Sequence, residues 1–261
     1  MLQIRDLQVN LGRRAVLRGV TLTARPGRLT AICGPNGSGK TTLLRAACGD
    51  LAYRGQIRLQ GAEVATTPGP QRATCRAVLA QSTALAFPFT VAEVVRLGQS
   101  FGPAAGGPDL TARALARVGL QGYGPRLYPE LSGGEQQRVQ LARVLTQVWD
   151  PVAHGVPRWL FLDEPVSSLD IAHQLQIMQI ARDYADAGGG VVAVMHDLNL
   201  TAMFADKIAL LAQGQLLAMG PPASVLRDDL LGRAYGCNLR VSTPPAQGPY
   251  LLPQSARAPA R

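Results

Sequence analysis

The sequence predicts an α/β fold with two additions: a small antiparallel β layer at the N-terminus and a helical insertion in the middle of the chain. Apolar and polar residues alternate at 2–9 and 15–23, and this period of two is typical of half-buried strands. Apolar strands then alternate with helical patterns at 29–48 and again at 159–195, which indicates βα units and a parallel sheet. Between about 84 and 148 the patterns are helical.

The composition is that of a globular protein. Of the 261 residues, 47% are hydrophobic and 16% are charged, so the chain is able to bury a large core. The formal net charge of +9 fits an anionic partner such as nucleic acid, acidic lipid or a nucleoside triphosphate, and it equally fits a solvated basic surface. The four cysteines form no C-x-x-C pair, which indicates packing residues in a reducing compartment. We find no apolar run near the roughly 18 residues of a membrane span and no signal peptide.

The elements between the N-terminal layer and the second βα region follow in order. After the strand at 29–33 and the helix at 42–48, short strands are predicted at 55–59 and 77–80. In the insertion, Thr90 and Glu93 form the capping box of a helix that runs to Leu97. A Gly/Pro loop at 102–108 then separates this helix from a second one at 110–118.

From residue 159 onward the βα pattern returns. We expect a strand to 163, a helix over 171–187, a strand over 191–195, a short helix and a hairpin over 208–219. The Pro/Ala-rich tail at 242–261 predicts a disordered end. The folded unit is therefore expected to span 1–241.

One glycine-rich stretch has the strand–loop–helix context of a phosphate-binding loop. The residues Gly34-Pro35-Asn36-Gly37-Ser38-Gly39-Lys40-Thr41 match G-x-x-x-x-G-K-[ST], the P-loop, and Thr42 continues the helix. Its backbone N–H groups and the helix N-terminus attract a polyphosphate. Lys40 is predicted to reach the β- and γ-phosphates, and the Thr41 hydroxyl to bind Mg²⁺. Lys40 and Lys207 are the only lysines, which indicates that Lys40 is kept where a compact point charge is needed.

Two adjacent carboxylates end the apolar strand at 159–163. Asp163 is predicted to hold Mg²⁺, directly or through water, and Glu164 to polarise an attacking water as general base. A strand followed by a carboxylate helix cap would show the same pattern. The P-loop upstream favours the nucleotide site.

A long helix opens at Leu131-Ser132-Gly133-Gly134-Glu135 and runs to about Val148. Ser132 and Glu135 again form a capping box, which is a sufficient structural explanation of those two residues. Gly133 and Gly134 are poor helix formers, each about 1 kcal/mol less favourable than Ala. They fit best where a helix N-terminus must approach a phosphate closely.

With these motifs in this order, the chain resembles the ATP-binding subunits of ABC transporters up to about residue 240. LSGGEQQR matches the signature motif of that family, Gln81 the Q-loop glutamine, and Asp163 with Glu164 the Walker B pair. Ser167-Ser168-Leu169-Asp170 matches the D-loop and His196 the switch histidine. The resemblance implies a RecA-like P-loop NTPase core with an N-terminal antiparallel subdomain and an inserted helical subdomain. It also implies an ATPase that uses ATP and Mg²⁺.

The resemblance also implies roles for the matched residues. Glu164, His196 and Gln81 form the expected catalytic group, with His196 near the γ-phosphate. Thr41, Gln81 and Asp163 form the expected metal set. The signature residues are expected to face the nucleotide of a second subunit across a two-fold axis, and the D-loop aspartate joins the nucleotide-binding set: Ser132, Gly133, Gly134 and Asp170.

The chain departs from the family pattern at the nucleotide base. The family usually places an aromatic residue in the first strands to stack on adenine, whereas residues 1–30 contain no Phe, Tyr, Trp or His. The planar guanidinium of Arg13 or Arg14 is a possible substitute. Val166 also stands where Thr is usual, and we expect little effect from it.

Softer features point to a subgroup. Ala86-Phe87-Pro88-Phe89-Thr90-Val91 resembles the importers of iron chelates, cobalamin and haem. The spacer at 148–158, DIAHQ at 170–174 and VAVMHDLNL at 192–200 look closest to the ATP-binding subunit of haemin importers. This implies a homodimer held by a permease dimer at the cytoplasmic face of the bacterial inner membrane, with a periplasmic haem-binding protein acting indirectly. A siderophore or cobalamin importer stays open as the alternative.

A soluble ABC ATPase that acts on nucleic acid or ribosomes is the second class of function, and the net charge of +9 suits it. DNA-tethering members carry long coiled coils between the P-loop and the signature, whereas here that gap is about 90 residues without heptads. Translation-factor members carry two cassettes, and this chain has one. We therefore expect no nucleic-acid partner.

Overall fold

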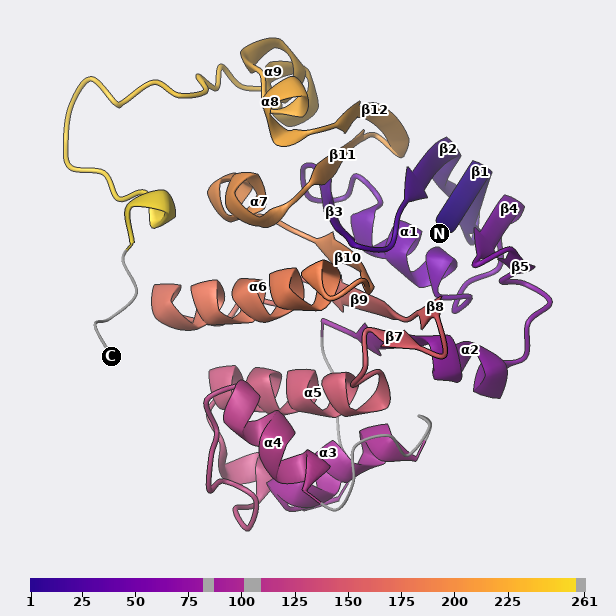
Figure 1. The fold of residues 1–261 in the computed structure, drawn as a ribbon. Coiled ribbons are helices and arrows are strands. Elements are labelled where there is room, and N and C mark those ends of the chain that lie inside the picture. The colour runs from indigo at the N-terminus through magenta and orange to yellow at the C-terminus, as the bar shows by residue number, and fades with distance from the viewer. Residues whose placement is uncertain (82–86, 101–108, 257–261) are drawn as a thin grey trace.

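Two sheets organise the protein, whose computed structural model describes residues 1–81, 87–100 and 109–256 (Figure 1). The larger sheet has six strands in the order β12-β11-β3-β10-β9-β6 and is parallel except where β11 meets β12. Its interior strands β9 and β10 are buried along their whole length, as expected where a parallel sheet is covered on both faces. The six strands are β3 (Arg28–Cys33), β6 (Arg76–Leu79), β9 (Trp159–Asp163), β10 (Gly190–Val194), β11 (Lys207–Ala212) and β12 (Gln215–Gly220).

The smaller sheet is antiparallel, with the order β2-β1-β4-β5. Helix α1 (Lys40–Ala47) lies between the two sheets, because its buried leucines share one apolar cluster with β1 and with Phe161 of β9. This cluster anchors the helix whose N-terminus carries the P-loop. The four strands are β1 (Leu2–Leu11), β2 (Arg14–Ala24), β4 (Arg54–Leu59) and β5 (Ala62–Glu63).

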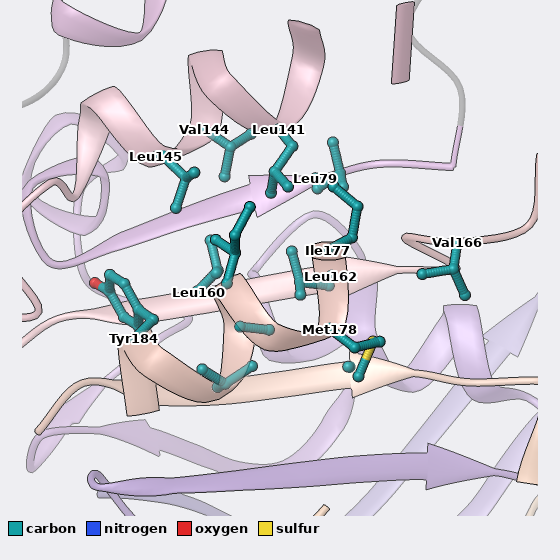
Figure 2. Close-up of a cluster of buried hydrophobic side chains, with 14 of the residues drawn as sticks. Leu79, Leu141, Val144, Leu145, Leu160, Leu162, Val166, Ile177, Met178 and Tyr184 are labelled. Carbon is teal, nitrogen blue, oxygen red and sulfur yellow. The ribbon is translucent and has the colours of Figure 1, made fainter. Parts of the chain in front are cut away.

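The second apolar cluster lies on the other face of the large sheet. Helix α5 (Gly133–Gln147) packs there against β6, and helix α6 (Ile171–Asp186) packs against β3 and β10, with side chains of β9 in the same cluster (Figure 2). Burial of these side chains is worth about 1.5–3 kcal/mol each relative to exposure, so the cluster fixes both helices on the sheet. The side chains labelled in the figure include Leu79, Leu141, Val144, Leu145, Leu160, Leu162, Ile177 and Met178.

The helical insertion contains α3 (Val91–Gln99), α4 (Leu110–Arg117), the 3₁₀ helix η1 (Tyr128–Glu130) and α5. Both predicted capping boxes are present, at the start of α3 and of α5. A Cβ at Gly98 would lie 1.9 Å from the Arg143 carbonyl oxygen, so only glycine permits the close packing of α3 on α5. The predicted loop at 102–108 and Ala86 lie outside the described residues.

Several short elements have no counterpart in the sequence-based expectations. They are α2 (Gly69–Cys75), β7 (Val152–Ala153), β8 (Val156–Pro157), α8 (Pro222–Val225), α9 (Asp228–Tyr235) and the 3₁₀ helix η2 (Pro253–Ser255). The predicted short helix after β10 is α7 (Leu198–Phe204). The described part of the tail ends at 256 and contains η2. The predicted disorder of 242–261 and the boundary at 241 stay predictions.

The predicted fold class is confirmed: an α/β core, an N-terminal antiparallel layer and a helical insertion. The P-loop helix begins at Lys40, two residues before the predicted Thr42, because the motif itself forms the first turn. Across residues 1–81, 87–100 and 109–256, none of the helices combines the length and the hydropathy needed to cross a lipid bilayer.

Candidate nucleotide site

The predicted catalytic residues meet at one edge of the six-stranded sheet. The P-loop follows β3, Gln81 follows β6, Glu164 follows β9 and His196 follows β10. Because these four strands are parallel neighbours in the sheet, their carboxyl ends lie at the same edge, where open α/β sheets bind ligands. The P-loop, Gln81, Glu164 and His196 line a cavity of about 730 Å³.

Two glycines shape the P-loop. Gly34 has φ 146°, and a Cβ there would lie 2.0 Å from the Leu211 carbonyl oxygen. Gly39 has φ 101°, and a Cβ there would lie 2.6 Å from Leu17 Cδ2. A side chain at Gly34 would clash with backbone, and the positive φ of Gly39 strains any other residue. The loop can therefore pack on β2 and β11 while its backbone N–H groups stay available to an anion.

The Lys40 ammonium is held inside the loop. Its Nζ donates to the carbonyl oxygens of Gly34 at 2.9 Å and Pro35 at 3.0 Å, and the residue is 5% exposed. Burial lowers the pKa of Lys40, while the negative charge of Glu164 opposes this shift. An ammonium has three N–H donors, so one remains for a phosphate oxygen.

Thr41 and Asp163 lie together at the start of α1. Thr41 Oγ1 donates to Asp163 Oδ1 at 3.1 Å. Burial raises the pKa of Asp163 above its ordinary value, although the hydrogen bond from Thr41 opposes this shift. Thr41, Asp163 and Gln81 line an adjoining cavity of about 260 Å³. These oxygen donors fit Mg²⁺, which prefers carboxylate, hydroxyl and amide oxygens.

Glu164 contacts both of the other predicted catalytic side chains, His196 and Gln81. Its Oε1 lies 2.5 Å from His196 Nε2, and its Oε2 accepts from Gln81 Nε2 at 3.0 Å. The backbone of Glu164 has φ 51°, a left-handed conformation that costs of order 1–3 kcal/mol in a residue other than glycine. Such strain persists where the surrounding contacts over-determine the geometry.

One of those contacts comes from the helical insertion and was not predicted. Gln137, on α5, donates from Nε2 to the Glu164 carbonyl oxygen at 3.1 Å. Its neighbour Gln136 instead donates to the carbonyls of Tyr128 and Leu131. The sequence places both glutamines in LSGGEQQR, but it does not indicate which of them turns toward the core.

The signature residues and the D-loop aspartate lie apart from this cavity, whereas Ser167 of the D-loop lines it. Ser132 Oγ donates to Glu135 Oε2 at 2.7 Å within the capping box. Asp170 caps α6, where its Oδ1 accepts from the His173 backbone N–H at 2.9 Å. None of the residues Ser132, Gly133, Gly134 and Asp170 is among the described residues that line the 730 Å³ cavity. One chain therefore brings together only part of the predicted set.

At the mouth of the nucleotide cavity the lining residues are aliphatic or basic. Leu11, Arg14 and Val16 line it beside the P-loop, and Leu11 is 48% exposed. Of the two arginines proposed to cover the base, Arg14 borders the cavity, whereas Arg13 does not belong to its described lining.

Comparisons with known proteins agree with this geometry. The ABC transporter family matches residues 17–167. The chain is 60% identical over 258 residues to the hemin import ATP-binding protein HmuV of Jannaschia sp. strain CCS1, covering 98% of this chain and 96% of the relative. It is 55% identical over 261 residues to the protein of the same name from Mesorhizobium japonicum, covering 98% and 99%.

Solved structures show the same fold. An ATP-binding subunit of an ABC transporter superimposes with a TM-score of 0.77 at 22% identity, covering 90% of this chain and 96% of that one. A dimeric ATP-binding cassette in a post-hydrolysis state with ADP and phosphate superimposes with a TM-score of 0.73 at 25% identity, covering 85% and 99%. The chain therefore belongs to the ABC transporter family, as a subunit that couples ATP hydrolysis to transport.

Proposed function

We propose that this subunit powers the uptake of haemin through a separate permease. The observation that carries the proposal is the contact of Glu164 with both His196 and Gln81 at the P-loop cavity, because it equips the chain for hydrolysis. The names of relatives that are 60% and 55% identical over nearly the whole chain support haemin as the cargo. A siderophore or cobalamin is the alternative cargo.

The hydrolytic chemistry follows from the side chains present. The P-loop N–H groups and Lys40 hold the phosphates of ATP. Thr41 and Asp163, with Gln81 beside them, hold Mg²⁺, which neutralises charge on the phosphates when bound. Glu164 accepts a proton from the attacking water. His196, whose ring touches the Glu164 carboxylate, orients that carboxylate and donates toward the γ-phosphate.

A second copy of the chain completes the site in this proposal. The signature residues Ser132, Gly133 and Gly134 form a helix N-terminus that binds an anion, yet they lie outside the cavity of their own chain. A two-fold arrangement makes the contact reciprocal and encloses two ATP molecules in one isologous interface. The dimeric state named for a solved relative supports this arrangement.

The dimer makes hydrolysis depend on concentration and on the partner. ATP turnover per subunit is expected to rise with subunit concentration, and Ser132→Arg subunits to inhibit wild-type subunits when the two are mixed. Mixing with a Thr66→Arg variant, altered at an exposed residue outside both site regions, serves as the control. A rate per subunit that is independent of concentration contradicts the shared site.

The transport partners are a permease dimer and, indirectly, a periplasmic haem-binding protein. The subunit is then held peripherally at the cytoplasmic face of the inner membrane, and its folded unit spans 1–241. Phe87 is 69% exposed and its ring packs edge-on against Phe89, which offers the permease an apolar contact. No nucleic acid takes part in this scheme.

Reconstitution tests the cargo. The subunit is combined in lipid vesicles with its permease partner, and ATP-driven uptake of haemin, a ferric siderophore and cobalamin is compared. Haemin uptake that the Glu164→Gln subunit fails to support is the expected result. Uptake of a siderophore or cobalamin in preference to haemin refutes the haemin assignment and leaves the ATPase assignment intact.

A further inference from the structure

A second cavity, of about 610 Å³, lies away from the nucleotide site. Four parts of the fold border it: the β4–β5 turn, helix α2, the β7–β8 hairpin and the C-terminal end of α3 at Ser100. We call it the hairpin cavity, since the hairpin belongs to the spacer at 148–158. Its volume falls within the range of about 300–1,000 Å³ that is usual for small-ligand sites.

The hairpin cavity holds a buried charge without a protein partner. Arg158 lines the cavity and is 5% exposed. Among the described residues, no carboxylate or carbonyl group pairs with its guanidinium, although its backbone N–H donates to the Pro151 carbonyl at 2.7 Å. Its guanidinium nitrogens are not among the fully buried atoms without a partner, so they stay accessible, and an anionic ligand in the cavity would supply the missing counter-charge.

A second arginine faces the same space. Arg72, on α2, donates to the carbonyl oxygens of Val64 at 2.9 Å and Thr67 at 3.0 Å, and its Nε is buried without a partner. The described lining contains no Asp or Glu. Two arginines therefore line the cavity, and its described lining contains no acidic residue that would neutralise their charge.

The rest of the lining combines apolar surface with an imidazole at the rim. Leu59 and Val64 are buried at one side, and Val156 of the hairpin is 48% exposed. His154 also lines the cavity. It has φ 50° in the two-residue turn that it forms with Gly155, a turn position where Asn, Asp and Gly are favoured.

We propose that the hairpin cavity binds haem, so that the imported product contacts its own ATPase. The carboxylates of haem match the guanidinium groups of Arg158 and Arg72, and its apolar macrocycle matches the aliphatic lining. His154 is placed to ligate the iron, since imidazole is a common axial ligand of haem. The identity of the ligand rests on the proposed haemin function, whereas the anion site itself rests on Arg158.

Haemin titration of the purified full-length subunit, followed by the Soret absorption band, tests this site. One saturable haemin per chain is expected, and Arg158→Gln is expected to weaken it by at least about tenfold, the scale of a lost charge-assisted hydrogen bond. Arg54→Gln, on the exposed face of β4 outside the cavity, is the matched control. Thermal unfolding of both variants shows whether each is folded.

A second pair of variants does not depend on a buried position. Val156→Asp adds a negative charge at the cavity rim and is expected to weaken haemin by about tenfold, since like charges repel. Val152→Asp adds the same charge to the same hairpin at a residue that is 40% exposed and outside the cavity lining, and it is expected to bind like the wild type. His154→Ala is expected to alter the haemin spectrum without altering the affinity for metal-free protoporphyrin.

Three results would overturn the inference. They are equal haemin affinity of Val156→Asp and Val152→Asp, the lack of a saturable site in the wild type, and displacement of haemin by inorganic phosphate at low concentration. The vesicle assay separates this inference from the proposed function. If the complex transports haemin that the subunit alone does not bind, this site fails and the proposed function stands. If the subunit binds haemin through the cavity but the complex transports another chelate, the reverse holds.

Discussion

Replacing Glu164 by glutamine is expected to stop hydrolysis while leaving the site assembled. The amide has the same shape as the carboxylate, so it can accept from Gln81 and donate to His196 across the two contacts of 3.0 and 2.5 Å. What it cannot do is accept a proton from water. General bases contribute about 10²–10⁴-fold to rates, so we expect kcat to fall at least 10²-fold, which is about 2.7 kcal/mol of barrier.

The affinity of the Glu164→Gln variant for ATP is expected to rise or to stay unchanged. Glu164 lines the cavity that receives the phosphates, and removing its negative charge lowers the repulsion of ATP. Phosphate release measures turnover, and a fluorescent nucleotide measures binding to the same preparation. Glu130→Gln, at an exposed glutamate outside the nucleotide cavity, controls for the loss of one charge. Turnover of Glu164→Gln within a few fold of the wild type would refute the assignment of this residue as the base.

Three further predictions concern nucleotide binding and stability. Lys40→Ala is expected to weaken ATP binding at least about tenfold, because a charge-assisted contact to phosphate is lost; unchanged affinity in a nucleotide titration would contradict the P-loop role. The affinities for GTP and ATP are expected to differ by no more than about tenfold, or about 1.4 kcal/mol, because Arg14 rather than an aromatic ring lines this part of the cavity. A hundredfold preference for ATP in competition binding would disprove this. Burial raises the pKa of Asp206, but hydrogen bonds from Arg182 at 2.6 Å and Arg28 at 2.8 Å outweigh it and lower the pKa overall. Its carboxylate therefore stabilises the fold above its ordinary pKa, and this contribution disappears as the pH falls through the lowered value; Asp206→Asn is expected to lose about 1–2 kcal/mol at neutral pH and nothing at low pH in denaturant unfolding.

The parts of the fold that could be predicted are those set by local sequence. The P-loop requires glycine at Gly34 and Gly39 for steric reasons that the motif already expresses. The buried strand at 159–163 and the capping boxes at Thr90 and Ser132 are likewise local patterns with one structural meaning.

The parts that could not be predicted depend on long-range contacts. Helix α2, with the sequence GPQRATC, has no buried residue and no amphipathic pattern. The β7–β8 hairpin has only two residues in each strand, which is too short for a period to be read. The hairpin cavity is formed by these two elements together with β4 and α3. The sequence therefore does not indicate that the side chain of Arg158 lines a cavity without a charged partner.

The position of Glu164, the proposed general base, depends on the helical insertion as well as on the core. The Glu164 side chain is held by Gln81 and His196 from loops of the core. Its strained backbone is held by the carbonyl contact with Gln137, on the helix that opens with the signature motif. A φ of 51° persists where several contacts hold it together. The Gln137 bond acts with the bond from the Glu164 N–H to the Val194 carbonyl at 3.2 Å and the bond from the Ser167 N–H to the Glu164 carbonyl at 3.4 Å. The first turns of the signature helix therefore contact the backbone of Glu164 in their own chain through Gln137, while the N-cap residue Ser132 lies outside the nucleotide cavity. One short stretch of α5 thus links the proposed base to the surface where a second copy is proposed to bind.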